Sequence, residues 1–453
     1  MLKEIVDIIS QGKREVEDLL KEDVKKVETV EIVGEYNEEK LTNRFISGDN
    51  IYIMNALLKG NGCQSMRGKL DLIYIDPPFL SKANYNSKII LPLDDELVTI
   101  ENFAYSDTWN EGSISYLKML YKRLLLMREL LSDRGSIYLH LDWHVVHYAK
   151  VLMDEIFGED MFLNEIIWSY KSGGVSKKYF SRKHDTILLY SKTKDYIFNA
   201  QKEKSYNRGF KPYRFKGVSE YEDEMGWYTL VNMKDVWNID MVGRTSSERM
   251  GYGTQKPEKL LERIVLASSN EDSVVADFFA GSGTTAVVAE RYNRKWILSD
   301  LGYASLQATK KRLMDIKSKG FIHEKIEGFY IPKGGRLKIH SIDKKSFEFD
   351  TKIISINLEG YEIDIDNIPI EEKYKDILYK VMLKDSLALI DIISIDTDYD
   401  GKIFRSRWQS KRDKESYKIP DKIELKLLKK AKRSIGIKIV DVFGFESEYI
   451  IEV

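Results

Sequence analysis

The sequence predicts a doubly wound α/β fold that carries an insertion and is followed by a β-rich C-terminal domain. Residues 72–75 form a short apolar run that stops at the sequence Asp-Pro-Pro-Phe, residues 76–79. Such a run closed by prolines is typical of a buried parallel strand. Residues 274–300 follow the order strand, glycine-rich turn, helix, strand and acid, which is typical of a sheet that binds a nucleoside at its carboxyl edge. Leucines and methionines spaced by three and four over residues 117–131 predict a core-facing helix.

The composition is that of a soluble globular protein with two or three domains. The chain has 453 residues, of which 43% are hydrophobic and 32% are charged. Neither a signal peptide nor an apolar span long enough to cross a bilayer is visible, so we expect a cytoplasmic protein without membrane contacts. The formal net charge is only −1, so a nucleic-acid partner would need local basic patches.

The cysteine and histidine content argues against disulfides and metal sites. The single Cys63 excludes an internal disulfide framework and a thiolate metal cluster. His144 and His147 share a helical face, but a third and a fourth ligand are missing from their neighbourhood in the sequence. We therefore predict no metal.

The first third of the chain predicts helices, one strand and a long connection. Residues 1–40 are highly charged, with apolar residues at helical spacing on both sides of Gly12, and predict one or two amphipathic helices. Residues 45–50 predict a strand and a turn before a helix. Residues 80–112 are polar and aromatic without clear periodicity, so we expect a functional loop or a mobile segment there. Further strands are predicted at 136–142, 166–168 and 186–190.

Basic and aromatic residues alternate between residues 170 and 216. Basic groups neutralise phosphates and aromatic rings stack on bases, so this mixture favours a nucleic-acid surface. A solvated, loop-rich insertion would have the same composition, and the stretch alone does not separate the two interpretations. The candidate DNA-binding residues are Lys171, Lys177, Lys178, Arg182, Lys183, Arg208, Lys211 and Arg214.

The turn at residues 76–79 offers a grip for a planar amino group. It brings together the Asp76 carboxylate, the backbone carbonyl of Pro77 and the ring of Phe79. The two oxygens can accept the two protons of an NH2 group while the ring stacks on the group that carries it. An ordinary strand followed by a proline turn would fit these residues equally well if they stood alone.

The glycine-rich turn favours a bound nucleoside. Gly281 and Gly283 let the backbone approach a ligand closely, and Asp300 ends the following strand, where a carboxylate could accept hydrogen bonds from ribose hydroxyls. A purely structural turn would also fit. A dinucleotide site would prefer the spacing G-x-G-x-x-G, and the chain lacks a phosphate-binding P-loop, so ATP is not expected. The pattern from Asp277 to Thr285 is that of S-adenosylmethionine binders.

Together the two motifs resemble an amino-group DNA methyltransferase. The turn at residues 76–79 precedes the glycine-rich loop at residues 277–285, an order that resembles the beta class of these enzymes. We call these two segments the catalytic turn and the cofactor loop, after the roles that the resemblance implies. The run Thr-Gln-Lys-Pro-Glu at residues 254–258 resembles the remaining cofactor motif of that class. The chain is most similar to the modification subunits of type III restriction systems, and the resemblance covers about residues 45–312.

The resemblance implies a Rossmann-like methyltransferase sheet with circularly permuted motif order and S-adenosylmethionine as cofactor. It implies a catalytic half at 41–168, a target-recognition region at 169–250 and a cofactor-binding half at 251–318. Outside the resemblance, the residue pattern predicts a helical segment at 1–40 and a β-rich domain at 319–453, where short β-rich runs alternate with turns. The implied catalytic residues are Asp76, Pro77, Pro78 and Phe79. The implied cofactor-binding residues are Asp49, Asp76, Lys256, Asp277, Phe279, Gly281, Ser282, Gly283, Thr284 and Asp300.

The resemblance further implies that the target base is flipped out of duplex DNA. An acid at the first position of the turn and an aromatic at the fourth favour adenine N6 over cytosine N4. Attack at carbon 5 of cytosine is excluded, because that route needs a Pro-Cys nucleophile and Cys63 follows a glycine. A methyltransferase acting on RNA or on a protein amide would use the same turn chemistry, and a non-catalytic DNA-recognition subunit would carry the same basic stretch. We expect a homodimer, and any restriction subunit with nuclease and helicase activity would be a separate chain.

Overall fold

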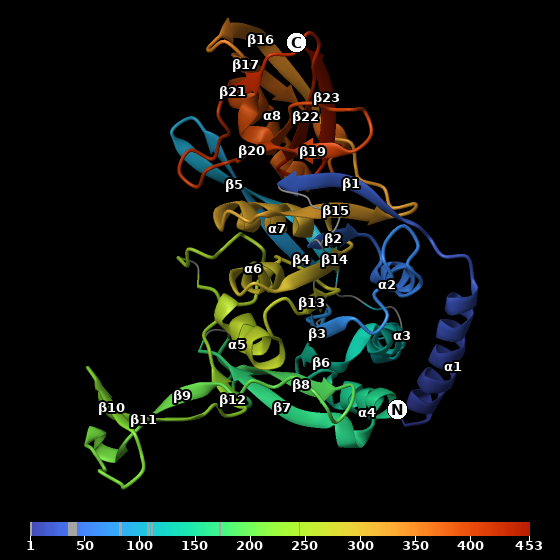
Figure 1. Ribbon diagram of the computed structural model, residues 1–453, viewed down its shortest axis with the longest axis vertical. Coiled ribbons are helices and arrows are strands. Elements are labelled where there is room, and N and C mark those ends of the chain that lie inside the picture. The colour runs from blue at the N-terminus through green and yellow to red at the C-terminus, as the bar shows by residue number, and fades with distance from the viewer. Residues whose placement is uncertain are drawn as a thin grey trace.

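The computed structural model describes residues 2–34, 43–80, 84–106, 109, 112–171, 174–243 and 245–453. A mixed sheet forms the centre of the molecule, with the C-terminal domain at one end and a small ribbon, β9–β11, standing out near the other (Figure 1). The central sheet consists, in spatial order, of β12 (Val236–Asn238), β7 (Phe162–Ser169), β8 (His184–Ser191), β6 (Leu131–Leu141), β3 (Leu70–Ile75), β13 (Val274–Asp277), β14 (Lys295–Asp300), β2 (Arg44–Ser47), β15 (Gly320–Ile326), β1 (Val27–Gly34) and β19 (Phe404–Ser406).

Helices cover both faces of this sheet, as a doubly wound fold requires. Alternate residues of β3 point to opposite faces, so Ile73 packs with one layer of helices and Leu72 with the other. The first layer contains α1 (Leu2–Lys21), α2 (Asn50–Lys59), α3 (Ser113–Leu130) and α4 (Val146–Phe157). The second contains α5 (Glu258–Ser268), α6 (Thr284–Arg291) and α7 (Tyr303–Asp315).

The two predicted motif strands are neighbours. β3 and β13 pair in parallel, with Leu72 beside Val275, and β14 follows on the other side of β13. Residues that follow these strands therefore meet at one edge of the sheet. This confirms the predicted arrangement of the two motifs in one crevice.

The N-terminal segment is only partly helical. α1 is one continuous helix through Gly12, and a Cβ on this glycine would lie 2.5 Å from Cδ1 of Tyr121. Glycine thus lets α1 lie directly on α3. The expectation of helices alone is wrong, because β1 follows and joins the central sheet between β15 and β19. Residues 35–40, also within the expected helical segment, lie outside the described residues.

The expected loop after the catalytic turn is mostly a hairpin. β4 (Asn84–Leu93) pairs with β5 (Glu96–Ser106) in an antiparallel ribbon. Its residues Ile89, Leu91 and Ile100 are buried in the core of the C-terminal domain. Packing against a domain far along the chain orders this segment, which explains why its local sequence shows no strong period.

The expected domain boundaries also shift. β8 lies within the proposed target-recognition region of residues 169–250 but occupies the central sheet between β7 and β6. The part that stands apart is the ribbon of β9 (Lys202–Tyr206), β10 (Glu220–Asp223) and β11 (Gly226–Asn232). Its two ends meet where Met233 N donates to Gln201 O. β15 lies after residue 319 but also belongs to the central sheet.

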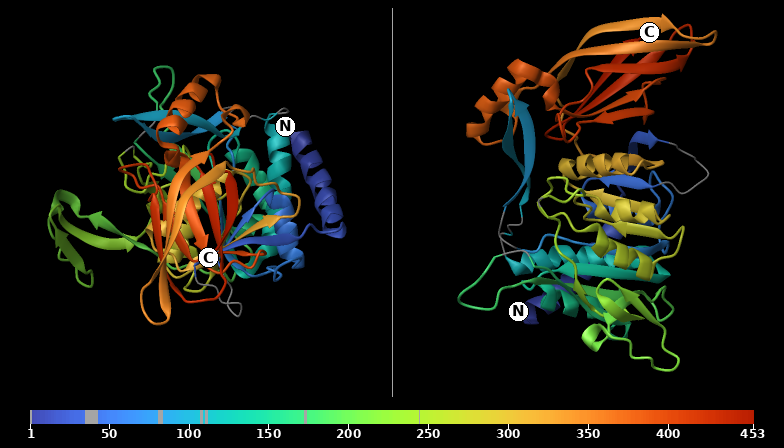
Figure 2. Two further views of the ribbon diagram at one scale, coloured as in Figure 1. Left: turned by 90° about the horizontal axis from the view of Figure 1, so that it is seen from above. Right: turned by 90° about the vertical axis from the view of Figure 1, so that its left-hand side faces the viewer.

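The C-terminal domain is β-rich, as predicted, and has its own core. Its sheets are β16 (Arg336–Ser346), β17 (Thr351–Glu362) and β21 (Lys422–Leu428), and β20 (Trp408–Lys411), β18 (Ile390–Asp396), β22 (Ser434–Asp441) and β23 (Glu446–Glu452). α8 (Glu372–Asp385) lies beside them (Figure 2). Short 3-10 turns occur at Glu159–Met161, Arg208–Phe210, Ile365–Asn367 and Ser386–Leu389.

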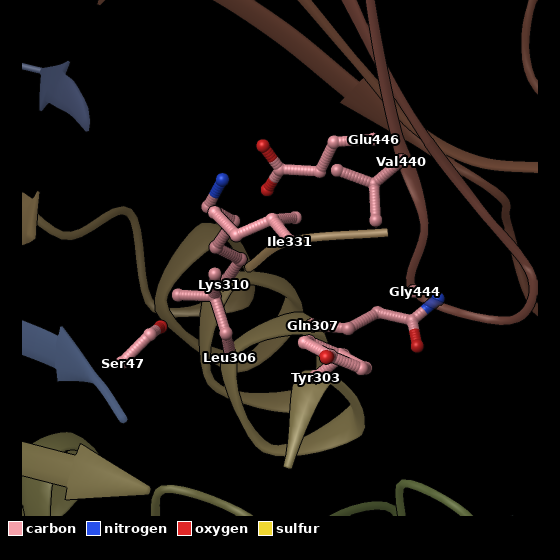
Figure 3. Close-up of a pocket in the computed structure, with 9 residues that line it drawn as sticks. All are labelled: Ser47, Tyr303, Leu306, Gln307, Lys310, Ile331, Val440, Gly444 and Glu446. Carbon is pink, nitrogen blue, oxygen red and sulfur yellow. The ribbon is translucent and has the colours of Figure 1, made fainter. Parts of the chain in front are cut away.

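A buried ionic cluster joins this domain to the central sheet. Glu31 on β1 lies 2.7 Å from Lys310 Nζ on α7 and 3.5 Å from Lys438 Nζ on β22. Glu446 lies 3.6 Å from Lys438 Nζ, and Figure 3 shows Glu446 near Lys310 where α7 faces β22. Glu31, His323 and Glu446 are close enough to share a cation. We assign no metal to them, because the two lysines already neutralise these carboxylates.

Among the described residues, no helix is long and apolar enough to cross a membrane.

Candidate active site

A cavity of about 1120 Å³ opens at the carboxyl ends of β3, β13 and β14. The turn at residues 76–79 forms one part of its wall, and residues 277–282 and Asp300 form another. Both predicted motifs thus line one space large enough for a nucleoside cofactor and a base.

Asp76 has one occupied and one open carboxylate oxygen. Oδ2 lies 2.5 Å from Lys256 Nζ, and the two side chains are 16% and 12% exposed. Oδ1 is buried and accepts no hydrogen bond from the residues that the structure describes. Lys256 also lies over the ring of Phe79, 5.2 Å from its centroid. Lys256, expected among the cofactor ligands, therefore holds the catalytic turn together.

A buried histidine stands behind Asp76. His140 Nδ1 is 2.8 Å from the Tyr74 hydroxyl and 3.9 Å from Asp76 Oδ1, and His140 Nε2 is 3.3 Å from Asp185 Oδ2. The Tyr170 hydroxyl donates to the other oxygen of Asp185 at 3.1 Å. These contacts form a chain of polar groups from the catalytic turn to Asp185 and Tyr170, which also line the cavity.

Two of these groups have shifted pKa values. Burial, followed by the charge of Asp76, raises the pKa of Tyr74 well above its ordinary value, so its hydroxyl stays protonated. Burial also raises the pKa of Asp185, but the hydrogen bond and charge of His140, helped by Lys256 and Tyr170, outweigh it and hold that pKa below its ordinary value. Asp185 is therefore a carboxylate at neutral pH.

The sequence alone did not reveal this chain of groups. His140 and Tyr74 lie on central strands, where a histidine or tyrosine among apolar residues is usually a core residue. The one available signal was the placement of Tyr74 two residues before Asp76, which puts both on the same face of the strand.

The Asp277 side chain stabilises the cofactor loop from within. Asp277 is 3% exposed, and its oxygens accept from Phe279 N at 3.0 Å and from the Thr285 hydroxyl at 2.6 Å. Burial raises the pKa of Asp277 to about 7, although these hydrogen bonds oppose the shift. The carboxyl group thus holds the loop; a direct contact with a ligand's ammonium group stays a proposal.

The Asp300 side chain connects the cofactor loop to the residue that precedes α7. Its oxygens accept from Gly281 N and from Gly302 N, each at 2.8 Å. Burial raises its pKa. The carboxylate lines the cavity and is fixed in position, as a ribose contact would require.

The two loop glycines serve different purposes. Gly281 has φ +51, and a Cβ there would meet nothing closer than 3.6 Å, so its main requirement is the backbone conformation. A Cβ on Gly283 would lie 2.3 Å from Thr309 Oγ1. Gly283 is therefore needed for close packing on α7, which the sequence did not reveal.

Ser282 and Thr284 turn partly toward a buried arginine. Arg312 NH1 donates to Thr284 Oγ1 at 2.7 Å and to Ser282 O at 3.3 Å. Arg312 NH2 pairs with Glu258 Oε1 at 2.6 Å. The two hydroxyl residues line the cavity and also tie the loop to α5 and α7.

Asp49 caps α2 at the cavity wall. Its Oδ1 accepts from Ile51 N at 3.1 Å and lies 2.7 Å from Arg123 NH2. The neighbouring Asn50 donates to Phe278 O at 2.7 Å. Arg123 bonds to both Asp49 and Asn50, so Asp49 is linked to the cofactor loop through these two residues. The expected contact of Asp49 with the adenine or ribose of the cofactor stays a proposal.

The candidate DNA-binding residues form two groups. Lys171, Lys177, Lys178, Arg182 and Lys183 follow β7, and Arg182 lies over the exposed Trp143 ring, 3.7 Å from its centroid. Arg208, Lys211 and Arg214 are exposed on the ribbon β9–β11. The first group adjoins the cavity, because Tyr170 and Asp142 line it. The second group is carried away from the central sheet (Figure 1).

Comparison with known proteins gives the family. The protein-family model described as DNA methylase matches residues 70–311 of this chain. The type II methyltransferase M2.LlaDCHI of Lactococcus lactis subsp. cremoris is 30% identical over 249 residues, which cover 54% of this chain and 82% of that protein. The DNA adenine methyltransferase YhdJ of Escherichia coli (strain K12) is 28% identical, with 54% and 76% covered.

One type III protein and one solved structure are also similar. The StyLTI Mod subunit of Salmonella typhimurium is 24% identical, with 54% of this chain and 49% of that subunit covered. The solved structure of the M1.HpyAVI–SAM complex has a TM-score of 0.39 and 18% identity, and covers 60% of this chain and 98% of that one. Since the family model spans more than half of the chain and includes both motifs, the chain belongs to the DNA methylase family.

Proposed function

We propose that this chain transfers a methyl group from S-adenosylmethionine to the exocyclic N6 of an adenine in duplex DNA. Membership of the DNA methylase family supports the reaction class. The name of the relative YhdJ, a DNA adenine methyltransferase, and the acid at the first position of the catalytic turn support adenine as the base.

The observation that carries the proposal is Oδ1 of Asp76. It is a buried acceptor without a donor among the described residues, beside an aromatic ring and at the wall of a large cavity. A buried acceptor left unpaired is costly, so such an atom favours a ligand that donates to it. The amino group of adenine is such a donor, and Phe79 offers its ring for stacking.

The other end of the cavity fits the cofactor. Asp300 is held in place as a carboxylate acceptor, and Gly281 leaves the loop backbone without a side chain toward the cavity. S-adenosylmethionine would supply a methyl group on a positively charged sulfur. Asp49, Phe279 and the backbone of the loop would surround it.

The residues of the chain then have the following roles. Asp76 Oδ1 and the Pro77 carbonyl accept the two amino protons, which draws the nitrogen lone pair out of the ring system and directs it at the methyl group. Lys256 orients Asp76 through their ion pair, and Phe79 stacks on the flipped base. The amino nitrogen would bond to the methyl carbon as the bond between that carbon and the sulfur breaks, S-adenosylhomocysteine would be the leaving group, and the proton lost by the nitrogen would pass to Asp76. His140, which is held by the Tyr74 hydroxyl, lies behind the carboxylate, 3.9 Å from Oδ1.

Long-read sequencing of DNA from cells that express this chain tests the proposal, with cells carrying an Asp76→Ala chain as the reference. We expect N6-methyladenine at one defined sequence only with the intact chain. N4-methylcytosine would overturn the assignment of the base. Unmethylated DNA, together with labelled methyl transfer to RNA or protein by the purified chain, would overturn the assignment of the substrate.

Asp300→Ala is expected to weaken cofactor binding. Loss of the carboxylate removes the proposed ribose contact and the hydrogen bonds to Gly281 and Gly302, and hydrogen bonds to charged groups contribute about 1.5–3 kcal/mol each. We expect the Kd for S-adenosylhomocysteine in calorimetry to rise at least about tenfold. Asp195→Ala, at an acid whose side chain is 83% exposed, serves as the control. An unchanged Kd for Asp300→Ala would contradict the ribose role.

The proposal includes partners. Duplex DNA would be bound by the basic residues near the cavity and on the ribbon, with the ribbon reading the target sequence. The likeness to a subunit named Mod supports a separate restriction subunit. We further propose a homodimer, which light scattering with and without DNA would test.

A further inference from the structure

The C-terminal domain reaches the same cavity as the cofactor loop. Pro369, Phe443 and Phe445 line it together with Asp300 and Leu301. The first three residues lie beyond residues 70–311, the part that the family model matches. The wall of this cavity is therefore built by two domains of this chain.

The turn that carries the two phenylalanines is held rigidly. It connects β22 to β23, and Oδ1 of the buried Asp441 accepts from Phe443 N at 2.9 Å and from Phe445 N at 3.1 Å. Gly444 has φ +82, and a Cβ there would lie 3.2 Å from the Cβ of Tyr303. The glycine thus allows the turn to lie against the first residue of α7, as Figure 3 shows for Gly444 and Tyr303.

Helix α7 is in turn fixed to the C-terminal domain. Gln307 Nε2 donates to Asp441 O at 2.9 Å and to Asp391 Oδ2 at 2.7 Å. Lys311 Nζ lies 2.9 Å from the other oxygen of Asp391. Because α7 begins three residues after Asp300, these contacts fix the distance between the turn and that carboxylate.

The groups around Asp300 on this side are apolar. Leu301 is 64% exposed although it lines the cavity, Pro369 is exposed, and Phe445 is half-buried. An exposed leucine next to a fixed acid and an aromatic ring suits a ligand that has a polar sugar and a flat, weakly polar ring. Bases stack on aromatic side chains in this way.

We propose that Phe445, with Leu301 and Pro369, forms a slot for the adenine ring of the cofactor, so that the C-terminal domain is a direct part of the cofactor site. This inference rests on the proposed function, since it takes the nucleoside of S-adenosylmethionine as the ligand. Asp300 receives the ribose, and the turn of the C-terminal domain covers the base attached to it.

Calorimetric titration of the full chain with S-adenosylhomocysteine tests the slot. Phe445→Ala is expected to raise the Kd about tenfold to a hundredfold, as the loss of one stacked ring does for bases. Phe445→Tyr keeps the ring and is expected to keep the Kd near that of the unaltered chain. Leu301→Asn changes an exposed side chain without risk to the fold and is expected to weaken binding as well. Phe349→Ala, at a fully exposed phenylalanine of the same domain, is the matched control.

The outcomes separate the slot from the proposed function. If Asp300→Ala weakens binding but Phe445→Ala and Leu301→Asn do not, the slot is wrong and the cofactor assignment stands. If the unaltered chain does not bind S-adenosylhomocysteine, the proposed function fails first. If Phe445→Ala lowers Tm, then Leu301→Asn and Phe445→Tyr decide the question.

Discussion

Asp76→Ala is expected to lower kcat for methyl transfer by about a hundredfold to a thousandfold or more, the usual cost of removing a group that stabilises developing charge. Oδ1 is the free acceptor of the catalytic turn, and Oδ2 holds Lys256. Their loss removes the hydrogen-bond acceptor for the amino group of the target base and the acceptor for its proton. The hydrogen bonds that hold Asp300 and the cofactor loop do not involve Asp76, so binding of S-adenosylhomocysteine should survive. Loss of that binding would instead support the cofactor contact that the resemblance implies for Asp76. A labelled-methyl assay under single-turnover conditions and calorimetry measure the two quantities.

Asp76→Asn is the informative companion to this variant. It keeps an oxygen that can accept a hydrogen bond but cannot take a proton or neutralise Lys256, so its kcat should lie between those of Asp76→Ala and the unaltered chain. Asp195→Ala, at a side chain 83% exposed, should leave turnover unchanged. Full turnover by Asp76→Ala would contradict the catalytic assignment.

Glu31→Ala is expected to lower the free energy of unfolding by about 3–5 kcal/mol, the cost of leaving a buried charge without its partner. Glu31 and Lys310 are 0% and 1% exposed, and the Glu31 carboxylate also accepts from the Ser406 hydroxyl. Removal of the carboxylate leaves the buried Lys310 ammonium group without its ion-pair partner at 2.7 Å. Urea unfolding followed by circular dichroism measures the change.

The same cluster sets the response to acid. Burial alone would raise the pKa of Glu31, but Lys310 and Lys438 outweigh it and hold that pKa below its ordinary value of 4.5. The stability from Glu31 is thus present above pH 4.5 and is lost as the pH falls below it. Burial lowers the pKa of His323 to about 3, so the unfolded chain binds more protons than the folded chain below pH 6.5. The contribution of His323 therefore decreases from pH 6.5 downward. Asp277 and Asp441 oppose this decrease, because their pKa values are raised to about 7 and the folded chain binds these two protons before the unfolded chain does.

A surface pair supplies the control for this variant. Glu28 lies 3.8 Å from Lys325, with side chains 45% and 32% exposed, and such pairs contribute about 0–1 kcal/mol. Glu28→Ala should therefore change the unfolding midpoint little. Equal effects of Glu28→Ala and Glu31→Ala on the free energy of unfolding would show that the buried cluster contributes no more to stability than an exposed ion pair.

Features with a local cause could be predicted from the sequence. The strand before Asp76 and the strand, turn and helix around Gly281 follow from apolar runs interrupted by proline or glycine, and the structure has them at the predicted places. The parallel pairing of β3 and β13 followed from the same pattern. In the candidate site, the cavity does bring Asp76, Phe79 and Asp300 together.

Features with a distant cause could not. β1 was hidden in a charged segment, because its Glu31 is compensated by lysines about 280 and 400 residues away in the chain. The ribbon β4–β5 packs against the C-terminal domain, and its sequence carries no sign of that partner. His140 acts through Tyr74 and Asp185, which only the sheet brings together.

The proposed role of the ribbon β9–β11 in reading the target sequence has a consequence for how new specificities would arise. It has its own aromatic contacts, such as Tyr206 with Tyr228, and its base is closed by the hydrogen bond from Met233 to Gln201. Just before the base, Asn199 is anchored to the end of α5 through Leu266 and Ser269. Because the two ends of the ribbon meet at one place, recombination can exchange the ribbon without changing the strand register of the central sheet. Under this proposed role, gene conversion within the ribbon would change the DNA sequence that is methylated and leave the methyl-transfer chemistry as it was.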